Sequence, residues 1–135
     1  MFSKVGKASR RILVADDDPV VRHLLTSIVE KEGYIPVVAE DGREAFRILQ
    51  SDADFSGAIF DMMMPNLDGL EVIRYMRTEK RLIRIPVLIV TSEKDLKFTA
   101  ASFAAGATVF LPKPFTAAQF HTTFKILLSE RNVAA

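Results

Sequence analysis

The chain has 135 residues and a formal net charge of +1, and 49% of its residues are hydrophobic. These values indicate one soluble globular domain with a substantial core, and they exclude an overall electrostatic attraction to nucleic acid or to a membrane surface. The lack of cysteine excludes a disulfide framework and a thiolate metal site.

The first ten residues are predicted to form a flexible, basic tail. Residues 1–11 carry four basic residues but no apolar segment of the kind that a signal peptide requires. No later stretch approaches the roughly 18 apolar residues of a membrane span. We therefore expect no contact with a membrane, a cytoplasmic location, and a solvated terminus rather than a binding segment.

Short apolar runs then alternate with helical patterns through residues 11–131, which we assign to one domain. The first helix is expected to begin at the capping residue Asp18, which Pro19 follows, and to end at Gly33. Strands are predicted over residues 12–15, 35–39, 58–60, 87–90 and 107–111. The other helices are predicted over about 42–50, 70–76, 96–104 and 120–131, before a short tail at 132–135.

The predicted helices carry apolar stripes that should face the core. The fourth helix is expected to bury Leu96, Ala100, Phe103 and Ala104, which would direct Phe98 towards solvent. The stripes of the first, second and fifth helices comprise Val21, Leu24, Leu25, Ile28 and Val29; Ala45, Phe46 and Leu49; and Phe120, Phe124, Leu127 and Leu128.

Five strand–helix units predict a parallel sheet covered by helices on both faces. Pro36 and Pro112 fall within the second and fifth strands, where a missing N–H is tolerated only at a sheet edge. Edges at these two strands fit an α/β flavodoxin-like fold, a doubly wound (βα)5 parallel sheet in the order 2-1-3-4-5. No glycine-rich turn follows the first strand, so the sequence does not indicate a dinucleotide-binding fold.

Polar side chains follow four of the predicted strands. Asp16 and Asp17 come after the first strand and Asp61 after the third, while Thr91 and Ser92 end the fourth and Lys113 ends the fifth. The carboxyl ends of these strands share one edge of the sheet, where open α/β sheets bind ligands. Three carboxylates suit a hard cation such as Mg²⁺, and the lysine would balance their charge and hold a phosphoryl oxygen.

These motifs resemble those of the response-regulator receiver domain of two-component signalling, in its single-domain, chemotaxis-regulator-like form. The likeness covers about residues 10–131 and rests on residues 12–19, on Asp61-Met62-Met63-Met64-Pro65 with Asp68-Gly69, on Thr91-Ser92, and on Lys113-Pro114-Phe115. The resemblance implies that Asp61 accepts a phosphoryl group from a histidine kinase or a histidine phosphotransfer protein. It also implies that Asp16, Asp17, Asp61 and the backbone carbonyl of Met63 hold Mg²⁺, while Thr91 closes on the phosphoryl group and Lys113 pairs with it.

The resemblance further implies a conformational switch. The backbone N–H of Ser92 would reach the phosphoryl group, and Phe110, where many relatives carry Tyr, would turn from exposed to buried. The change would reach a downstream protein target through the fourth helix, fifth strand and fifth helix, with Phe98 as an anchor and without direct contact to nucleic acid. Because only residues 132–135 follow the predicted domain, a complete chain would signal through a partner, whereas a fragment would lack its effector.

The lifetime of the phosphorylated state is expected to depend on the residue two positions beyond Asp61. In this family that residue borders the path of the hydrolytic water, and here it is Met63. A methionine side chain cannot hydrogen-bond this water, so hydrolysis should be slow, with Glu93 partly orienting the water.

The same residues allow two other functions. A Mg²⁺-dependent phosphatase or phosphotransferase with an aspartyl nucleophile would also place an Asp at a strand end, but it typically needs a second acid at the position of Met63. A receiver-like interaction module without phosphorylation is disfavoured by the intact Asp61, Thr91 and Lys113. We expect a switch that catalyses only its own phosphorylation and slow autodephosphorylation, not an enzyme acting on free substrate.

Overall fold

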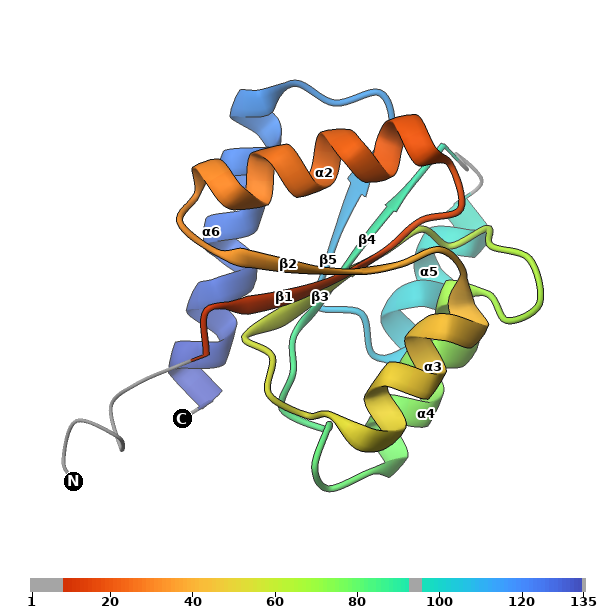
Figure 1. Cartoon of the computed structure of the whole chain (residues 1–135). Coiled ribbons are helices and arrows are strands. Elements are labelled where there is room, and N and C mark those ends of the chain that lie inside the picture. The colour runs from red at the N-terminus through yellow and green to blue at the C-terminus, as the bar shows by residue number, and fades with distance from the viewer. Residues whose placement is uncertain (1–8, 93–95, 135) are drawn as a thin grey trace, which may run out of the picture.

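The computed structural model describes residues 9–92 and 96–134, with side chains up to residue 129. Five strands alternate with five helices along these residues (Figure 1). The strands are β1 (Arg11–Ala15), β2 (Ile35–Ala39), β3 (Gly57–Phe60), β4 (Val87–Thr91) and β5 (Val109–Pro112). The helices are α2 (Pro19–Lys31), α3 (Gly42–Ser51), α4 (Gly69–Thr78), α5 (Leu96–Ala105) and α6 (Ala117–Ala134).

The strands form one parallel sheet in the order β2-β1-β3-β4-β5, which confirms the predicted flavodoxin-like topology. Pro36 lies in β2 and Pro112 lies in β5, and these two strands form the edges of the sheet, as predicted. Pro112 lies opposite Thr91, and the backbone N–H of the next residue, Lys113, donates to the Thr91 carbonyl at 2.9 Å. The missing proline donor is thereby replaced at the point where the strand delivers Lys113 to the sheet edge.

Helices cover both faces of the sheet, with α2 and α6 on one side and α3, α4 and α5 on the other (Figure 1). Alternate residues along the strands supply the two cores because successive side chains of a strand point to opposite faces. In β1, Leu13 and Ala15 belong to the core beneath α3 and α4, whereas Ile12 and Val14 belong to the core beneath α2 and α6. None of the described helices combines the length and apolar character that crossing a membrane requires.

The predicted signals mark both ends of α2. Asp18 caps α2 by accepting hydrogen bonds from the N–H groups of Val20 and Val21, and Gly33 ends it with a φ of +89°. Asp68 and Glu71 form a capping box at the start of α4. Helix α6 extends to Ala134, so the predicted end near 131 was too early. The predicted amino-terminal tail lies outside the described residues for positions 1–8, as does position 135 of the carboxyl-terminal tail.

The predicted inner face of α5 is wrong. Leu96 and Phe103 are 81% and 47% exposed, Ala100 and Ala104 are exposed as well, and Ser102 is the buried residue of the helix. Ser102 is tolerated there because its hydroxyl donates to the Thr99 carbonyl at 2.8 Å. The helix therefore packs through small side chains and leaves its larger apolar ones outside.

Three smaller deviations concern the other helices. Leu24 of α2 is exposed because it lines an open apolar cavity rather than the core. Phe46 of α3 is half-buried, and its ring packs on Tyr75 of α4 with the two centroids 4.5 Å apart. Leu128 of α6 is only partly buried, whereas Phe120, Phe124 and Leu127 form the predicted inner face.

Candidate functional site

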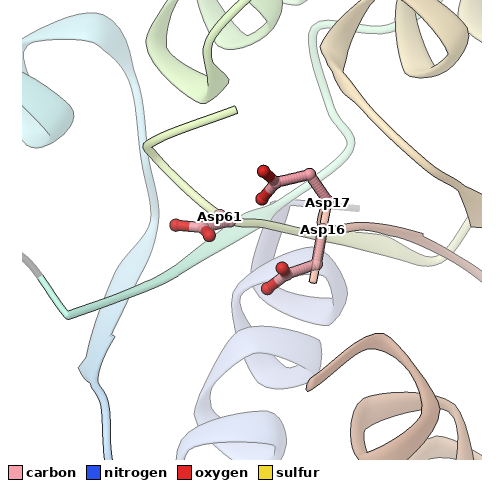
Figure 2. Close-up of side chains that lie close together, drawn as sticks. All are labelled: Asp16, Asp17 and Asp61. Atoms are coloured by element: carbon pink, nitrogen blue, oxygen red, sulfur yellow. The ribbon is translucent and has the colours of Figure 1, made fainter. Parts of the chain in front are cut away.

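The sheet brings four charged residues together at the carboxyl ends of its strands. Asp16 and Asp17 directly follow β1, Asp61 directly follows β3, and Lys113 directly follows β5. Figure 2 shows the side chains of the three aspartates gathered at this edge of the sheet. The pairing of β1 with β3 places Ala15 opposite Phe60, so Asp16 and Asp61 leave the sheet side by side.

The distances define a compact cluster. One carboxylate oxygen from each of Asp16, Asp17 and Asp61 lies within 4.8 Å of the others. The Lys113 ammonium bridges two of them, since its Nζ lies 3.1 Å from Asp16 Oδ2 and 3.2 Å from Asp61 Oδ2. Asp16 and Asp61 are buried and Asp17 is exposed, so the cluster opens to solvent on the Asp17 side.

Backbone groups hold the two buried carboxylates in place. Asp16 Oδ1 accepts a hydrogen bond from the N–H of Asp18 at 2.9 Å, and Asp61 Oδ1 accepts one from the N–H of Met63 at 3.2 Å. Arg22, from the first turn of α2, donates to the backbone carbonyl of Asp16 at 2.8 Å. Each buried carboxylate thus has one oxygen on a backbone N–H and the other on Lys113.

Burial and crowding perturb the charges of the cluster. Burial raises the pKa of Asp16 and the Asp61 carboxylate raises it further, against the lowering effect of the Asp18 N–H and Lys113. Burial alone would lower the pKa of Lys113, but the carboxylates of Asp61 and Asp16 together raise it above its ordinary value. The site therefore carries excess negative charge that a cation would relieve.

The donor set fits a hard divalent cation. All three side chains offer oxygen, two of them are held by backbone hydrogen bonds, and Asp17 keeps an open approach from solvent. Mg²⁺ is commonly held by one or two carboxylates and keeps several positions for water or phosphate. The chemistry of these residues thus supports the predicted magnesium site.

The remaining predicted residues lie at the end of β4, within β5 and beside Asp61. Thr91 is buried at the end of β4, Ser92 is exposed immediately after it, and Phe110 is half-buried in β5 opposite Ile89. The backbone N–H of Met63 donates a hydrogen bond to the Asp61 carboxylate, and Met63 is 56% exposed. Glu93 lies outside the described residues.

Two glycines allow the segment between β3 and α4 to lie close to neighbouring backbone at the site. A Cβ atom on Gly69 would lie 2.6 Å from the carbonyl oxygen of Asp61, and one on Gly42 would collide with the carbonyl oxygen of Leu67. The N–H of Gly69 also donates to the Met62 carbonyl at 3.1 Å. These close approaches require glycine and fix the backbone that carries Met63.

An apolar cavity of about 350 Å³ adjoins the cluster. Val21, Leu24, Pro114 and Phe115 form most of its wall, and Ser92 and Lys113 reach it from the site side. The exposed side chain of Val20 lies one residue before Val21 on α2. The cavity offers apolar contact to a molecule that approaches the carboxylates from this side.

Sequence reasoning missed three groups that shape the site. Arg22 had no sequence signal, because a basic residue on an amphipathic helix is usually solvated. The N–H of Asp18 was overlooked because the cap role already explained that residue. Gly69 entered only as part of the Asp68-Gly69 motif, although its contact with the Asp61 carbonyl is what excludes a side chain.

Comparisons with known proteins point to one protein family. Residues 12–125 match the sequence model of the family described as the response regulator receiver domain. The response regulator MprA of Mycolicibacterium vanbaalenii is 39% identical over 118 residues, a match that covers 87% of this chain and 50% of that protein. The chain spans about half the length of the curated relatives that it matches.

Two solved structures are similar over nearly the whole chain. The chemotaxis protein CheY4 of Vibrio cholerae has a TM-score of 0.82 at 30% identity, with 90% of this chain and 100% of that chain covered. A CheY-like response regulator receiver domain protein of Methanospirillum hungatei has a TM-score of 0.85 at 25% identity, with 96% and 100% covered.

Proposed function

This chain belongs to the response regulator receiver domain family, and we propose that it accepts a phosphoryl group on Asp61 and thereby switches its binding to a protein target. Receiver domains of two-component systems are signalling switches rather than enzymes acting on free substrate. The acceptor residue, the cation, the phosphoryl donor and the output surface described below are our proposals for this chain.

The observation that carries the proposal is the position of Asp61 within the cluster. Its carboxylate is held by the Met63 N–H on one oxygen and by Lys113 on the other, beside two further carboxylates at the mouth of the sheet. A carboxylate that only stabilised the fold would be expected to have its charge balanced. Among the described residues, the three aspartates of the cluster have one lysine, Lys113, to balance their negative charge. This imbalance is what we expect of a site that binds a cation together with a phosphoryl group.

Phosphoryl transfer to Asp61 requires alignment and charge neutralisation more than covalent help from the protein. An Asp61 oxygen would form a bond to phosphorus while the bond between phosphorus and the donor's histidine nitrogen breaks, giving an acyl phosphate and a free histidine. Lys113, already 3.2 Å from Asp61 Oδ2, would stay paired with the phosphoryl oxygens. The two backbone contacts of Asp16 and Asp61 would keep both carboxylates oriented during the step.

Mg²⁺ would be held by Asp16, Asp17, Asp61 and the backbone carbonyl of Met63. Bound there, the ion would supply positive charge that offsets the phosphoryl oxygens and the crowded carboxylates. The glycines at positions 42 and 69 hold the segment that carries Met63 against the site.

Thr91, Ser92 and Phe110 would convert phosphorylation into a change of shape. The Thr91 hydroxyl and the Ser92 N–H would draw towards the phosphoryl oxygens, moving the segment that leads into α5. Phe110 is half-buried against the core beneath α3 to α5, so its ring can move inward as that segment shifts. We place the responsive surface on α5, β5 and α6.

The phosphoryl donor would be a histidine kinase or a histidine phosphotransfer protein. The cavity between α2 and the Lys113–Phe115 segment favours a protein donor, because its largely apolar wall would pack against side chains around the donor histidine. The target would be another protein rather than nucleic acid. A cytoplasmic location agrees with these partners.

A phosphatase acting on free substrate is less well supported. The residue two positions beyond Asp61 is Met63, whose side chain has no acid to protonate a leaving group. The proposed chemistry is therefore limited to phosphorylation of the protein itself and slow loss of that phosphoryl group.

The proposal is tested by incubating the protein with Mg²⁺ and acetyl phosphate and measuring its intact mass. The wild type should gain one phosphoryl group, and Asp61→Asn should gain none because the acceptor oxygen is lost. Asp18→Asn is the matched control, since Asn caps a helix as well as Asp does and should leave labelling intact. Undiminished labelling of Asp61→Asn would remove Asp61 from its role.

A further inference from the structure

A second surface of the protein lies between α4 and α5. A groove of about 460 Å³ is lined by Arg74, Arg77 and Thr78 on one wall and by Ala101, Ala104 and Ala105 on the other. Both sets have the spacing i, i+3, i+4, so each forms one continuous face of its helix. None of these residues belongs to the Asp61 cluster.

Arg77 forms a rigid end to this groove. Its guanidinium donates to the carbonyls of Gly106, Ile83 and Ile85 at distances of 2.8 to 3.2 Å. A Cβ atom on Gly106, whose φ is +113°, would lie 2.8 Å from the Arg77 side chain, so the two residues fit closely. Among the described residues no carboxylate pairs with Arg77, and its charge is met only by carbonyl groups.

Arg74 adds a second guanidinium one helical turn earlier. It is exposed, and within the described part of the chain it forms no hydrogen bond or ion pair. Residues 74–84, which include Arg74 and Arg77, contain five basic residues and one acidic residue, although the whole chain is nearly neutral. A carboxylate placed between the two arginines would accept charge-assisted hydrogen bonds mainly from Arg74. It would also be attracted by the charge of Arg77, four of whose five N–H groups already donate to carbonyls.

The opposite wall of the groove favours a ligand that has an apolar part as well as an anionic group. The three alanines present methyl groups, and the exposed Ala104 leaves room above the helix backbone. An aliphatic stem would cover these methyl groups while its carboxylate reached the arginines. A glutamate side chain on a protein segment has this combination, whereas a free inorganic anion has no apolar part to bury.

We propose that the α4–α5 groove docks an acidic segment of a partner protein, with a glutamate carboxylate between Arg74 and Arg77 and its stem on Ala101, Ala104 and Ala105. The site exists in the unphosphorylated protein and needs neither Mg²⁺ nor Asp61. The proposed partner would therefore bind the unphosphorylated protein, unlike a target that binds only after phosphorylation.

The test uses backbone amide NMR shifts of the uniformly labelled protein. The probes are two alanine-rich peptides about 15 residues long, a length at which such peptides become appreciably helical, with a central Leu-Glu or Leu-Gln pair. Free glutarate is the third probe. The glutamate peptide should give saturable shifts in residues 74–78 and 101–106, and the glutamine peptide should not.

Two variants and a matched control test the groove itself. Arg74→Gln removes the free guanidinium and Ala104→Leu fills the groove, and each should weaken binding of the glutamate peptide by about tenfold. Arg84→Gln removes an equally exposed arginine outside the groove and should change binding less than twofold by the same scale. Asp61→Asn should bind the peptide like the wild type, whether or not the phosphorylation proposal holds.

Three outcomes would overturn the proposal. Absence of saturable shifts would show that the groove has no acidic occupant. Equal losses in Arg74→Gln and Arg84→Gln would indicate diffuse attraction to a basic surface. Glutarate binding as tight as the glutamate peptide would assign the groove to a small anion instead of a protein segment.

Discussion

Asp61 and Met63 are coupled through one hydrogen bond, from the Met63 N–H to Asp61 Oδ1 at 3.2 Å. The Met63 side chain itself is 56% exposed and points no polar group at the site. Water that attacks a phosphoryl group on Asp61 would pass a side chain that can neither orient it nor accept its proton. The proposed acceptor Asp61 is therefore held by polar contacts that suit phosphorylation, whereas we expect the Met63 side chain to give no help to hydrolysis.

Replacing Met63 by Asn should shorten the lifetime of the phosphorylated state. The amide can hydrogen-bond the attacking water, whereas the thioether cannot do so effectively, and general positioning of this kind is worth up to about 10²-fold in rate. Decay of the acyl phosphate after removal of acetyl phosphate is the measurement, followed by intact mass. Met63→Leu serves as control and should decay like the wild type. Equal rates for Met63→Asn and the wild type would show that this side chain does not gate the water.

The strands, the two ends of α2 at Asp18 and Gly33, and the gathering of charged residues at one sheet edge were predictable from sequence. Asp16, Asp61 and Lys113 directly follow strands whose apolar runs are unambiguous, and parallel strands bring such positions to one edge. Helix α5 was not predictable. Phe98 is 37% exposed, as expected. However, it lies four positions before the buried Ser102, so both residues lie on the same side of the helix.

The failure at α5 has a physical cause. Its sequence places apolar residues all round the helix, so hydrophobic periodicity cannot identify the inner face. Ala101 and Ala105 pack against the core beneath α3 and α4, and Ser102 is buried with its hydroxyl bonded to the Thr99 carbonyl of its own helix. The contacts of Arg77 with the Gly106, Ile83 and Ile85 carbonyls could not be predicted either, because every residue type carries a backbone carbonyl.

We expect phosphorylation to change α5, β5 and α6 more than other elements. Amide exchange with Mg²⁺ and beryllofluoride, a phosphoryl mimic, should differ from that of the free protein mainly over residues 96–129. Thr91 and Ser92 lead into α5, and Phe110 packs against the same core, which gives a short mechanical path. Phe110→Ala should still bind the mimic but show a smaller change in α5. Changes restricted to α2 and α3 would place the responsive surface elsewhere.

For the whole molecule, we expect the crowded carboxylates of the candidate site to lower stability. Three carboxylates lie within 4.8 Å of one another, and Lys113 bridges only two of them. The pKa of Asp16 is raised above its ordinary 3.8. An acid whose folded-state pKa is raised ionises more readily when unfolded, so its contribution to stability falls as pH rises from 3.8 through the folded-state value.

Asp61→Asn should therefore be as stable as the metal-free wild type or more stable, by roughly 0.5 to 2 kcal/mol, the usual gain from relieving a strained functional site. Urea unfolding at neutral pH without divalent ions measures this difference. The gain should shrink below pH 3.8, where Asp16 is protonated in both states. Mg²⁺ should stabilise the wild type more than the variant, because the variant has lost a ligand. A clearly less stable variant in the absence of metal would contradict the crowding of charge.

The most direct measurement locates the phosphoryl group itself. Borohydride reduces an acyl phosphate to an alcohol, so a phosphorylated aspartate becomes homoserine, which peptide mass spectrometry assigns to one position. After treatment with Mg²⁺ and acetyl phosphate, we expect homoserine at position 61 and at no other aspartate. Homoserine at position 16 or 17, or a protein that gains a phosphoryl group without any homoserine, would contradict phosphorylation of Asp61.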